Sequence, residues 1–178
     1  MSNTENIQIV EYEGKYAKEM SEIILGNLYT INIKDYGKEV IDRLARHFTE
    51  DEIKKNFPNR VKCFVALSDG KVVGTASVDT FKDTDGVKVE NNNNKYIILT
   101  IFVDLEKQRQ GIGRQLIEKI EEYASQVEAD ELLIPSSIYG CEIYRKLGYD
   151  FYNGIHELSK GGTYMLFKKI KKYNKKNK

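Results

Sequence analysis

Residues 103–116 place two glycines and several cationic side chains directly after an apolar run, a combination that could bind an anion. They read Val-Asp-Leu-Glu-Lys-Gln-Arg-Gln-Gly-Ile-Gly-Arg-Gln-Leu, which predicts a strand end, a tight loop and a helix start. The first N–H groups of a helix have no partner inside it, and the helix dipole is positive at that end. Gly111 and Gly113 leave no Cβ between the backbone and a ligand. The segment therefore predicts a pyrophosphate site.

The spacing excludes two familiar phosphate loops. A dinucleotide fingerprint needs a third glycine where this chain has Leu116. A P-loop needs Lys and Ser or Thr after its last glycine, but Arg114 and Gln115 follow Gly113. The pattern that neither loop explains is Gln-x-x-Gly-x-Gly after an apolar strand. The alternative to a pyrophosphate site is a strand-to-helix turn that binds no ligand.

A second segment carries a related signal. Residues 132–149 predict a short apolar strand and then a helix closed by Gly148, with the ending Ile-Tyr-Arg-Lys-Leu-Gly-Tyr. Together with the loop before it, in this order and spacing, it resembles the coenzyme A loop and the later helix of the GNAT N-acetyltransferase superfamily. The two motifs cover roughly residues 95–150, and the resemblance extends loosely over most of the chain.

The resemblance implies a fold of the α/β class whose sheet is of the mixed α+β type. We expect a single GNAT-like domain with a central mixed sheet, a splayed parallel strand pair and helices on both faces. It also implies acetyl-CoA as co-substrate, with backbone groups of the buried strand bound to pantetheine and the loop bound to pyrophosphate. Surface solvation is the alternative for the loop cations. The implied coenzyme residues are Ile101, Phe102, Val103, Gln108, Arg109, Gln110, Gly111, Ile112, Gly113, Arg114, Ser137 and Tyr144.

The implied reaction is direct attack of a primary amine on the thioester, with Tyr144 as general acid for the departing thiolate. Packing of Tyr144 against the sheet is the alternative. Some family members place a glutamate base in the buried strand, but the corresponding residue here is Ile97. Deprotonation through water, aided by Thr100, Glu90 or Tyr139, is then expected. The missing glutamate also keeps open a non-catalytic acyl-CoA sensor of the same fold.

The acceptor is expected to be a small molecule or a protein with a primary amine. In the family it contacts the first two helices, the loop between them and the closing hairpin. Asp35, Glu39 and Glu157 are candidate partners for a cationic acceptor, or simply solubilising charges. The resemblance also allows a homodimer. The candidate acceptor residues are Tyr29, Asn32, Tyr36, Thr100 and His156.

Hydrophobic periodicity predicts the elements that position these residues. Thr49 with Glu52 predicts a capping box, and Ser68-Asp69-Gly70 predicts a hairpin turn. Residues 83–94 are polar and predict a loop, and the nearly unbroken apolar run 96–103 predicts a strand buried on both faces. The remaining strands are expected at 7–12, 61–67, 71–81, 132–134, 149–152 and 163–170, and helices at 16–26, 38–48, 112–124 and 137–147.

Composition limits the class of protein. The 178 residues suggest one domain over 1–170 and a lysine-rich tail over 171–178. Residues 168–178 hold seven lysines and no acid, so the rest of the chain has a net charge of −6. A solvated tail is the simplest interpretation, and nucleic-acid binding is not favoured because no aromatic-rich basic face accompanies it.

Cys63 and Cys141 have no metal-ligand spacing, so we expect no metal. No segment resembles a membrane span or a signal peptide, which predicts a cytoplasmic protein.

Overall fold

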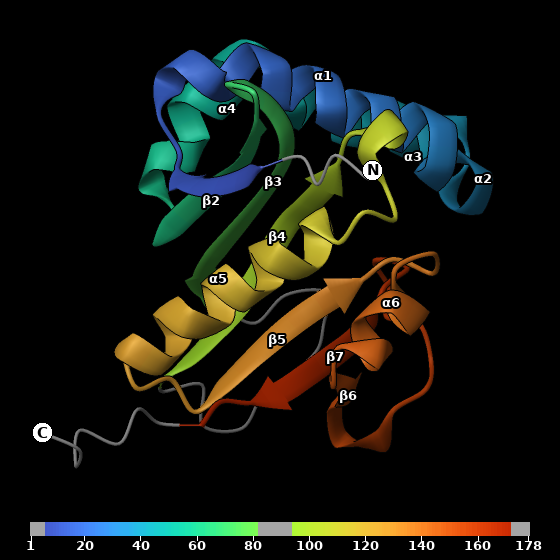
Figure 1. Cartoon of the computed structure of the whole chain (residues 1–178). Helices are drawn as coiled ribbons and strands as arrows, with labels where there is room; N and C mark the ends of the chain where they lie inside the picture. Colours follow the sequence, from blue (N-terminus) through green and yellow to red (C-terminus); the bar gives the residue numbers. More distant parts are fainter. Residues whose placement is uncertain (1–5, 82–93, 172–178) are drawn as a thin grey trace, which may run out of the picture. The chain divides into compact units, whose positions relative to one another are not determined.

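The computed structural model describes residues 6–81 and 94–171 (Figure 1). Hydrogen bonds join its strands into a seven-stranded mixed sheet in the order β1-β2-β3-β4-β5-β7-β6. The mixed α/β class predicted from the sequence is confirmed. The strands are β1 Ile7–Glu11, β2 Lys62–Ser68, β3 Lys71–Thr80, β4 Lys95–Val103, β5 Glu131–Ser136, β6 Asp150–Phe151 and β7 Tyr164–Lys169. The α-helices are α1 Ala17–Asn27, α2 Ile33–Tyr36, α3 Lys38–Ala45, α4 Glu50–Asn56, α5 Ile112–Gln126 and α6 Cys141–Lys146.

The chain forms two compact units. The first takes in Met1–Ser77 and Thr100–Glu118, and the second takes in Val78–Leu99 and Lys119–Lys178. Strands β3 and β4 and helix α5 run from one unit into the other.

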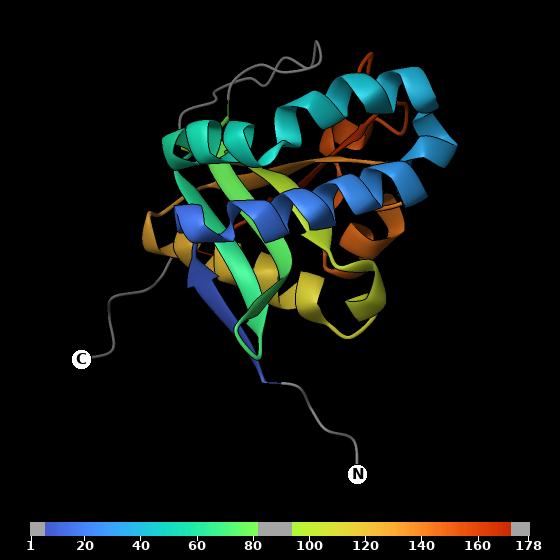
Figure 2. The ribbon, with the colours of Figure 1, turned by 90° about the horizontal axis from the view of Figure 1, so that it is seen from above.

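In the first unit, helices α1 to α4 bury one continuous apolar core against the strands. β1 pairs antiparallel with β2, from Ile7↔Ser68 to Glu11↔Phe64. Helices α1 and α4 lie side by side (Figure 2), and both contribute fully buried side chains. Burial of each large aliphatic side chain contributes about 1.5–3 kcal/mol, so this core supplies much of the unit's stability. Its members include Met20, Ile24, Ile41, Ile53, Cys63 and Val65.

Helix α5 begins over a glycine of β3. A Cβ at Gly74 would lie 3.1 Å from Leu116 Cδ1, 3.2 Å from Ile112 Cγ2 and 3.3 Å from Phe102 O. These distances are shorter than ordinary van der Waals contacts. Gly74 therefore allows the first turns of α5 to lie close to the strand, next to the predicted coenzyme loop.

In the second unit, β4 and β5 pair in parallel only at their first residues. The register runs from Lys95↔Glu131 to Ile97↔Leu133, although β5 continues to Ser136. An ion pair of 2.9 Å between Lys95 and Glu131, both largely buried, lies at the paired end. β5 pairs antiparallel with β7 along its whole length, and β7 pairs with β6. Within this unit the parallel register of β4 with β5 ends at Ile97.

Several local predictions hold. The Asp69 and Gly70 backbones have φ of +49° and +78°, the left-handed pair that a two-residue hairpin turn of this kind requires. Thr49 caps α4, with its Oγ1 accepting from Glu52 N at 3.3 Å. The second half of the capping box differs, since the Glu52 carboxylate accepts from Asn56 Nδ2. Cys63 is a core residue of the first unit.

Three expectations are corrected. The loop expected between the first two helices, 16–26 and 38–48, is itself largely helical, with a π-helix at Leu28–Asn32 followed by α2. Helix α6 begins four residues later than Ser137, since residues 138–140 form a turn first. Only Ile97 and Ile98 of the apolar strand β4 are fully buried. From Leu99 onward the strand is half-buried, beyond the point where its parallel pairing with β5 ends. The predicted polar loop at 83–94, with Glu90, lies almost wholly outside the described residues.

Candidate functional site

The predicted pyrophosphate loop follows β4 in the first unit. Asp104 N donates to Val73 O at 2.9 Å, which holds the strand end against β3. The Asp104 side chain accepts from Glu106 N at 2.9 Å and so caps the 3-10 turn Leu105–Lys107. The loop therefore starts from a fixed point.

The loop enters α5 through left-handed backbone. Arg109 has φ of +64° and Gly111 has φ of +82°, and the first α-helical bond runs from Gln115 N to Gly111 O at 3.1 Å. The N–H groups of Ile112, Gly113 and Arg114 precede that bond, so they are the unpaired amides of a 15-residue helix. Such a terminus attracts an anion.

The two loop glycines are needed for different reasons. A Cβ at Gly111 would meet nothing, but its positive φ disfavours any other residue. At Gly113 a Cβ would lie 3.6 Å from Val103 Cγ2, an ordinary contact. Because the packing of the first unit does not require glycine at 113, the bare backbone there is consistent with the close approach of a ligand.

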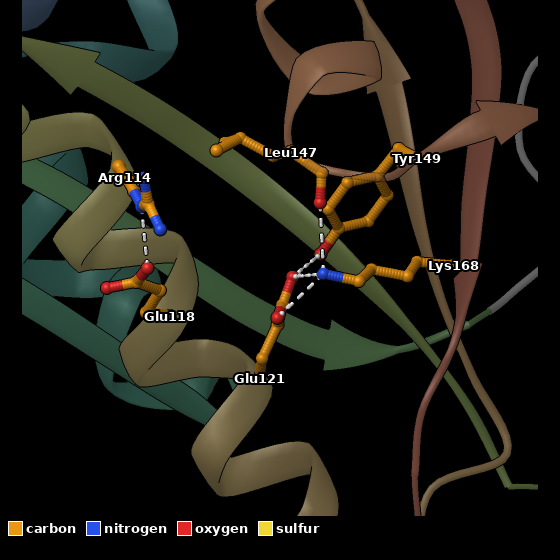
Figure 3. A network of polar contacts seen from close by, with 6 residues as sticks. All are labelled: Arg114, Glu118, Glu121, Leu147, Tyr149 and Lys168. Carbon is orange, nitrogen blue, oxygen red and sulfur yellow. Dashed lines mark hydrogen bonds and ion pairs between the residues drawn. The ribbon is translucent and has the colours of Figure 1, made fainter.

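The side chains of the loop divide between solvent and protein. Arg109 and Gln110 are exposed. Arg114 Nε donates to Glu118 Oε1 at 2.7 Å in an exposed pair one helical turn along (Figure 3). Gln108 is half-buried, and its amide donates to Asn27 Oδ1 at 3.0 Å. The cations thus remain accessible to an anion, whereas the Gln108 side chain is engaged by α1.

The end of β4 offers fewer free backbone groups than the sequence suggests. Val103 O accepts from Asn27 Nδ2 at 2.9 Å and lies 3.4 Å from Gln108 Nε2. Its carbonyl is therefore occupied by side chains. The Phe102 ring packs edge-on against Phe48, 6.5 Å between centroids, as part of the first unit's core. Among the predicted pantetheine partners, the carbonyl of Val103 is already committed within the protein.

Thr100 occupies an unusual backbone conformation for a strand. It has φ of +56°, which is rare for a β-branched residue and costs energy. Its hydroxyl oxygen accepts from the Arg60 guanidinium and lies 3.1 Å from Ser77 Oγ. Arg60 also bonds to Ser77 and stacks on Phe57, 4.2 Å from its centroid. A hydroxyl that already accepts from a guanidinium is a poor proton acceptor, which disfavours Thr100 as the residue that aids deprotonation.

Tyr144, the candidate general acid, lies on α6 in the second unit. Its side chain is half-buried, and burial raises the pKa of the phenol to about 12. Among the residues that the structure describes, none hydrogen-bonds to its hydroxyl. The phenol is thus fully protonated at neutral pH and free to donate.

The turn before α6 is organised by serine side chains. Ser137 Oγ accepts from Gly140 N at 3.1 Å, so Ser137 caps the turn that leads into the helix. Ser136 Oγ donates to Ser137 O at 2.8 Å, and Cys141 N donates to the same carbonyl at 3.2 Å. Ser137 therefore caps the turn that precedes α6.

A network around Lys168 holds the other end of α6 (Figure 3). Lys168 Nζ on β7 lies 2.8 and 3.0 Å from the two carboxylate oxygens of Glu121 and donates to Leu147 O at 3.0 Å. Tyr149 donates to the same carboxylate at 2.9 Å, and its burial beside Glu121 raises the pKa of its phenol. The cation satisfies a carbonyl at the end of α6, so the helix that carries Tyr144 is fixed to α5 and β7.

The acceptor candidates of the first unit have different surroundings. Tyr29 is exposed, and its hydroxyl donates to Asp42 Oδ1 at 2.8 Å. Lys38 pairs with the same carboxylate and, with Tyr29, lowers the pKa of Asp42. Asn32 is half-buried in the π-helix, and Tyr36 packs against the core. Tyr29 and Asn32 therefore remain available to an acceptor, whereas the ring of Tyr36 has a packing role.

In the second unit, His156 stacks on Phe151 with 4.0 Å between centroids. The Arg145 guanidinium also lies over the Phe151 ring, 4.9 Å from its centroid. The segment around His156 is exposed, with Ile155 and Leu158 among its apolar residues. Tyr139 is also exposed. This part of the chain can present a histidine and aromatic rings to an acceptor.

Two residues of the site have no counterpart in the sequence prediction. Asn27 follows an apolar helical run, and Arg60 precedes an apolar strand, so each has the sequence context of an ordinary surface residue. Their roles depend on partners 76 and 40 residues away in the chain, Val103 and Thr100. A polar residue at the buried end of an amphipathic helix is the one signal that could have identified Asn27.

Within residues 6–81 and 94–171, no His, Cys, Asp and Glu side chains gather as metal ligands, and Cys63 and Cys141 are free thiols. In the same residues, no helix has both the length and the apolar character that a bilayer crossing demands.

A seven-stranded mixed sheet with helices, in which a glycine-bearing loop leads from β4 into α5, defines the mixed α/β fold class of this chain. The chain belongs to the acetyltransferase (GNAT) family, whose model matches residues 25–149. That range contains β4, the loop, α5 and α6.

Solved structures share the fold at low sequence identity. A PaiA N-acetyltransferase from Thermoplasma acidophilum, in complex with coenzyme A, is 16% identical with a TM-score of 0.74, covering 92% of this chain and 99% of its own. A GNAT acetyltransferase from Brucella melitensis, in complex with acetyl-CoA, is 17% identical with a TM-score of 0.61, covering 94% and 90%. The ribosomal-protein-S18-alanine N-acetyltransferase from Escherichia coli is 15% identical with a TM-score of 0.60, covering 97% and 99%. A search of curated protein sequences finds no match.

Proposed function

We propose that this protein transfers the acetyl group of acetyl-CoA to a primary amine of a small molecule or a protein. The observation that carries the proposal is the loop before α5, where the bare backbone of Gly113 lies among the first amides of the helix. It lies within the range matched by the acetyltransferase family. The coenzyme complexes of PaiA and of the Brucella enzyme support acetyl-CoA as the donor.

In the proposed reaction the amine nitrogen attacks the thioester carbonyl carbon, and the C–S bond breaks as the tetrahedral intermediate collapses. The products are an acetylated amine and the free thiol of coenzyme A. No covalent enzyme intermediate is required, because holding two reactants in line supplies several kcal/mol of the barrier reduction. The amides at 112–114, with Arg109 and Arg114, bind the pyrophosphate.

Tyr144 acts on the leaving group in this proposal. Its hydroxyl donates a hydrogen bond to the departing sulfur and passes on its proton as the thiol leaves. A pKa of about 12 keeps the phenol protonated in every free enzyme molecule at neutral pH. Because a thiol is a stronger acid than this phenol, stabilisation of the developing thiolate by the hydrogen bond is the larger part of the effect.

The acceptor ammonium loses a proton to water before its neutral nitrogen attacks the thioester. Ile97, at the position where some family members carry a glutamate, is buried among Leu133 and Met165 and offers no base. The exposed Tyr29 and His156 and the half-buried Asn32 bind the acceptor in this proposal. We further propose that residues 1–170 act together as one acetyltransferase domain in the cytoplasm, with 171–178 as a tail.

Calorimetric titration with acetyl-CoA tests the donor, with dephospho-CoA and NAD as matched controls. Micromolar affinity for acetyl-CoA that neither control reproduces supports the loop as the coenzyme site. A panel of primary amines is then screened by release of free thiol. Absence of acetyl-CoA binding would leave the loop as a bare turn and end the proposal.

The buried Ile97 also favours a second candidate, a non-catalytic acyl-CoA sensor of the same fold. The Tyr144→Phe variant separates the two. For an enzyme, thiol release slows while acetyl-CoA affinity stays within a few-fold. For a sensor, neither protein releases thiol with any amine, and both bind the coenzyme equally.

A further inference from the structure

Asn27, the last residue of α1, has a buried side chain that bonds in three directions. It is 4% exposed. Its Nδ2 donates to Ile23 O and to Val103 O, both at 2.9 Å, and its Oδ1 accepts from Gln108 Nε2 at 3.0 Å. Two carbonyl acceptors on one side fix which end of the amide is nitrogen. The amide is satisfied in one orientation only.

These bonds join the end of β4 to the start of the coenzyme loop. Val103 is the last residue of β4, and Gln108 follows the 3-10 turn Leu105–Lys107. Gln108 Nε2 also lies 3.4 Å from Val103 O, so three residues form a closed polar triangle. The loop is thereby held at Val103 and again at Gln108, on both sides of that turn.

The same residue is where α1 changes its helical geometry. The π-helix Leu28–Asn32 begins directly after Asn27 and carries Tyr29 and Asn32, the acceptor candidates. Single π turns inside helices are rare and often occur at functional sites. Asn27 therefore belongs both to the coenzyme loop, through its side chain, and to the acceptor segment, through its backbone.

We propose that Asn27 is a positioning residue that orders the coenzyme loop and joins it to the π-helical segment that binds the acceptor. The role in catalysis rests on the proposed function, whereas the ordering of the loop does not. A buried, fully paired amide is costly to disturb, because removing one partner leaves the others unsatisfied. The loop amides are then held ready before the coenzyme arrives, which reduces the entropy lost on binding.

Hydrogen exchange of the free protein tests the ordering without any ligand. In Asn27→Asp, the side chain keeps an acceptor for Gln108 but can no longer donate to Ile23 O and Val103 O. We expect amides of residues 104–111 to exchange at least tenfold faster, while those of α4 are unchanged. The matched control is Asn56→Asp, which alters an exposed asparagine of α4 bonded to Glu52. Unchanged exchange in 104–111 would overturn the inference.

Calorimetry with acetyl-CoA on the same proteins, well below their unfolding temperatures, tests the consequence for binding. We expect Asn27→Asp to bind acetyl-CoA at least tenfold more weakly, and Gln108→Met to do the same. The double variant should lose less affinity than the product of the two single fold-losses, because both substitutions remove the same link between Asn27 and Gln108. If Asn27→Asp does not fold, Gln108→Met gives both readouts.

Faster exchange with no coenzyme binding in the unaltered protein would uphold the inference and refute the proposed function. Unchanged affinity in a variant with faster exchange would overturn the catalytic part of the inference.

Discussion

Gly140 faces the ring of Tyr144 so closely that a Cβ at 140 would lie 2.9 Å from Tyr144 Cε2. The same Cβ would lie 3.3 Å from the hydroxyls of Ser136 and Ser137. Tyr144 N also donates to Gly140 O at 3.1 Å, so the two residues are bound through the backbone. The absence of a side chain at 140 therefore determines where the phenol lies.

We expect Gly140→Ala to lower the rate of thiol release at least tenfold. The added methyl group pushes the Tyr144 ring away, and displacement of a catalytic group by about 1 Å can cost a hundredfold in rate. Affinity for acetyl-CoA should stay within threefold. Steady-state kinetics and calorimetry check this. The control is Gly14→Ala, where a Cβ would meet nothing within 4 Å. A full rate in Gly140→Ala would mean that Tyr144 has no part in the chemistry.

The sequence predicts most of the elements because their signals are local. The hairpin needs positive φ at two adjacent residues, which Asp69-Gly70 supplies, and Thr49 caps α4 through a residue three positions on. The helix after the coenzyme loop follows from apolar spacing alone. The loop itself is predicted from two glycines; the positive φ of Gly111 accounts for the first, whereas packing does not require the second, Gly113.

What the sequence does not predict depends on distant partners. The π-helix after Asn27 and the strained backbone of Thr100 arise where side chains bond to residues far along the chain. The late start of α6 follows from the capping of a preceding turn by Ser137, a choice between two local structures that periodicity cannot distinguish. Tyr144 is predicted by family resemblance, but the close approach of Gly140 to its ring arises only in the folded chain.

The pKa of Tyr144 predicts an alkaline loss of stability. The folded value of about 12 lies above the ordinary 10.0, so the folded state holds its proton over a range where the unfolded state has released it. The stabilisation is fully present below pH 10 and declines as pH rises from 10 to 12. We expect Tyr144→Phe to lose less stability than the unaltered protein over that range, by up to about 1.4 kcal/mol per pH unit. Denaturant titrations at pH 8 and 10.5 measure the difference. Parallel declines in the two proteins would contradict the prediction.

The raised pKa of Tyr144 also predicts how kcat/KM for thiol release depends on pH. Since Tyr144 stays protonated to about pH 12 in the free enzyme, kcat/KM should show no fall that depends on this phenol between pH 7 and 10. A pH profile of thiol release, corrected for ionisation of the amine, checks this. A fall near pH 9 that disappears in Tyr144→Phe would show that the phenol titrates there.

Gly113→Ala separates packing from ligand binding. The new methyl group would lie 3.6 Å from Val103 Cγ2, so the free protein should keep its unfolding temperature or gain slightly. The backbone amide at 113 would then be shielded from a pyrophosphate, and we expect acetyl-CoA to bind at least tenfold more weakly. Thermal unfolding and calorimetry on one preparation measure both. Unchanged affinity would mean that the ligand does not approach the backbone at 113.

Lys168→Met removes the cation at the centre of the network in Figure 3. Glu121 loses its partner at 2.8 Å, and the carbonyl of Leu147 loses a donor at 3.0 Å. The side chains of Lys168 and Glu121 are only 30% and 22% exposed, so we expect a loss of about 2 kcal/mol in the free energy of unfolding. The control is Lys119→Met, which breaks a more exposed pair with Glu122 on the same helix and should cost at most about 0.5 kcal/mol. Denaturant unfolding compares the two variants.

Because α6 would lose its anchor at Leu147, the thiol-release rate of Lys168→Met should also fall, whereas that of Lys119→Met should not. Equal costs in the two variants would place Lys168 among ordinary surface ion pairs, with no role in holding α6.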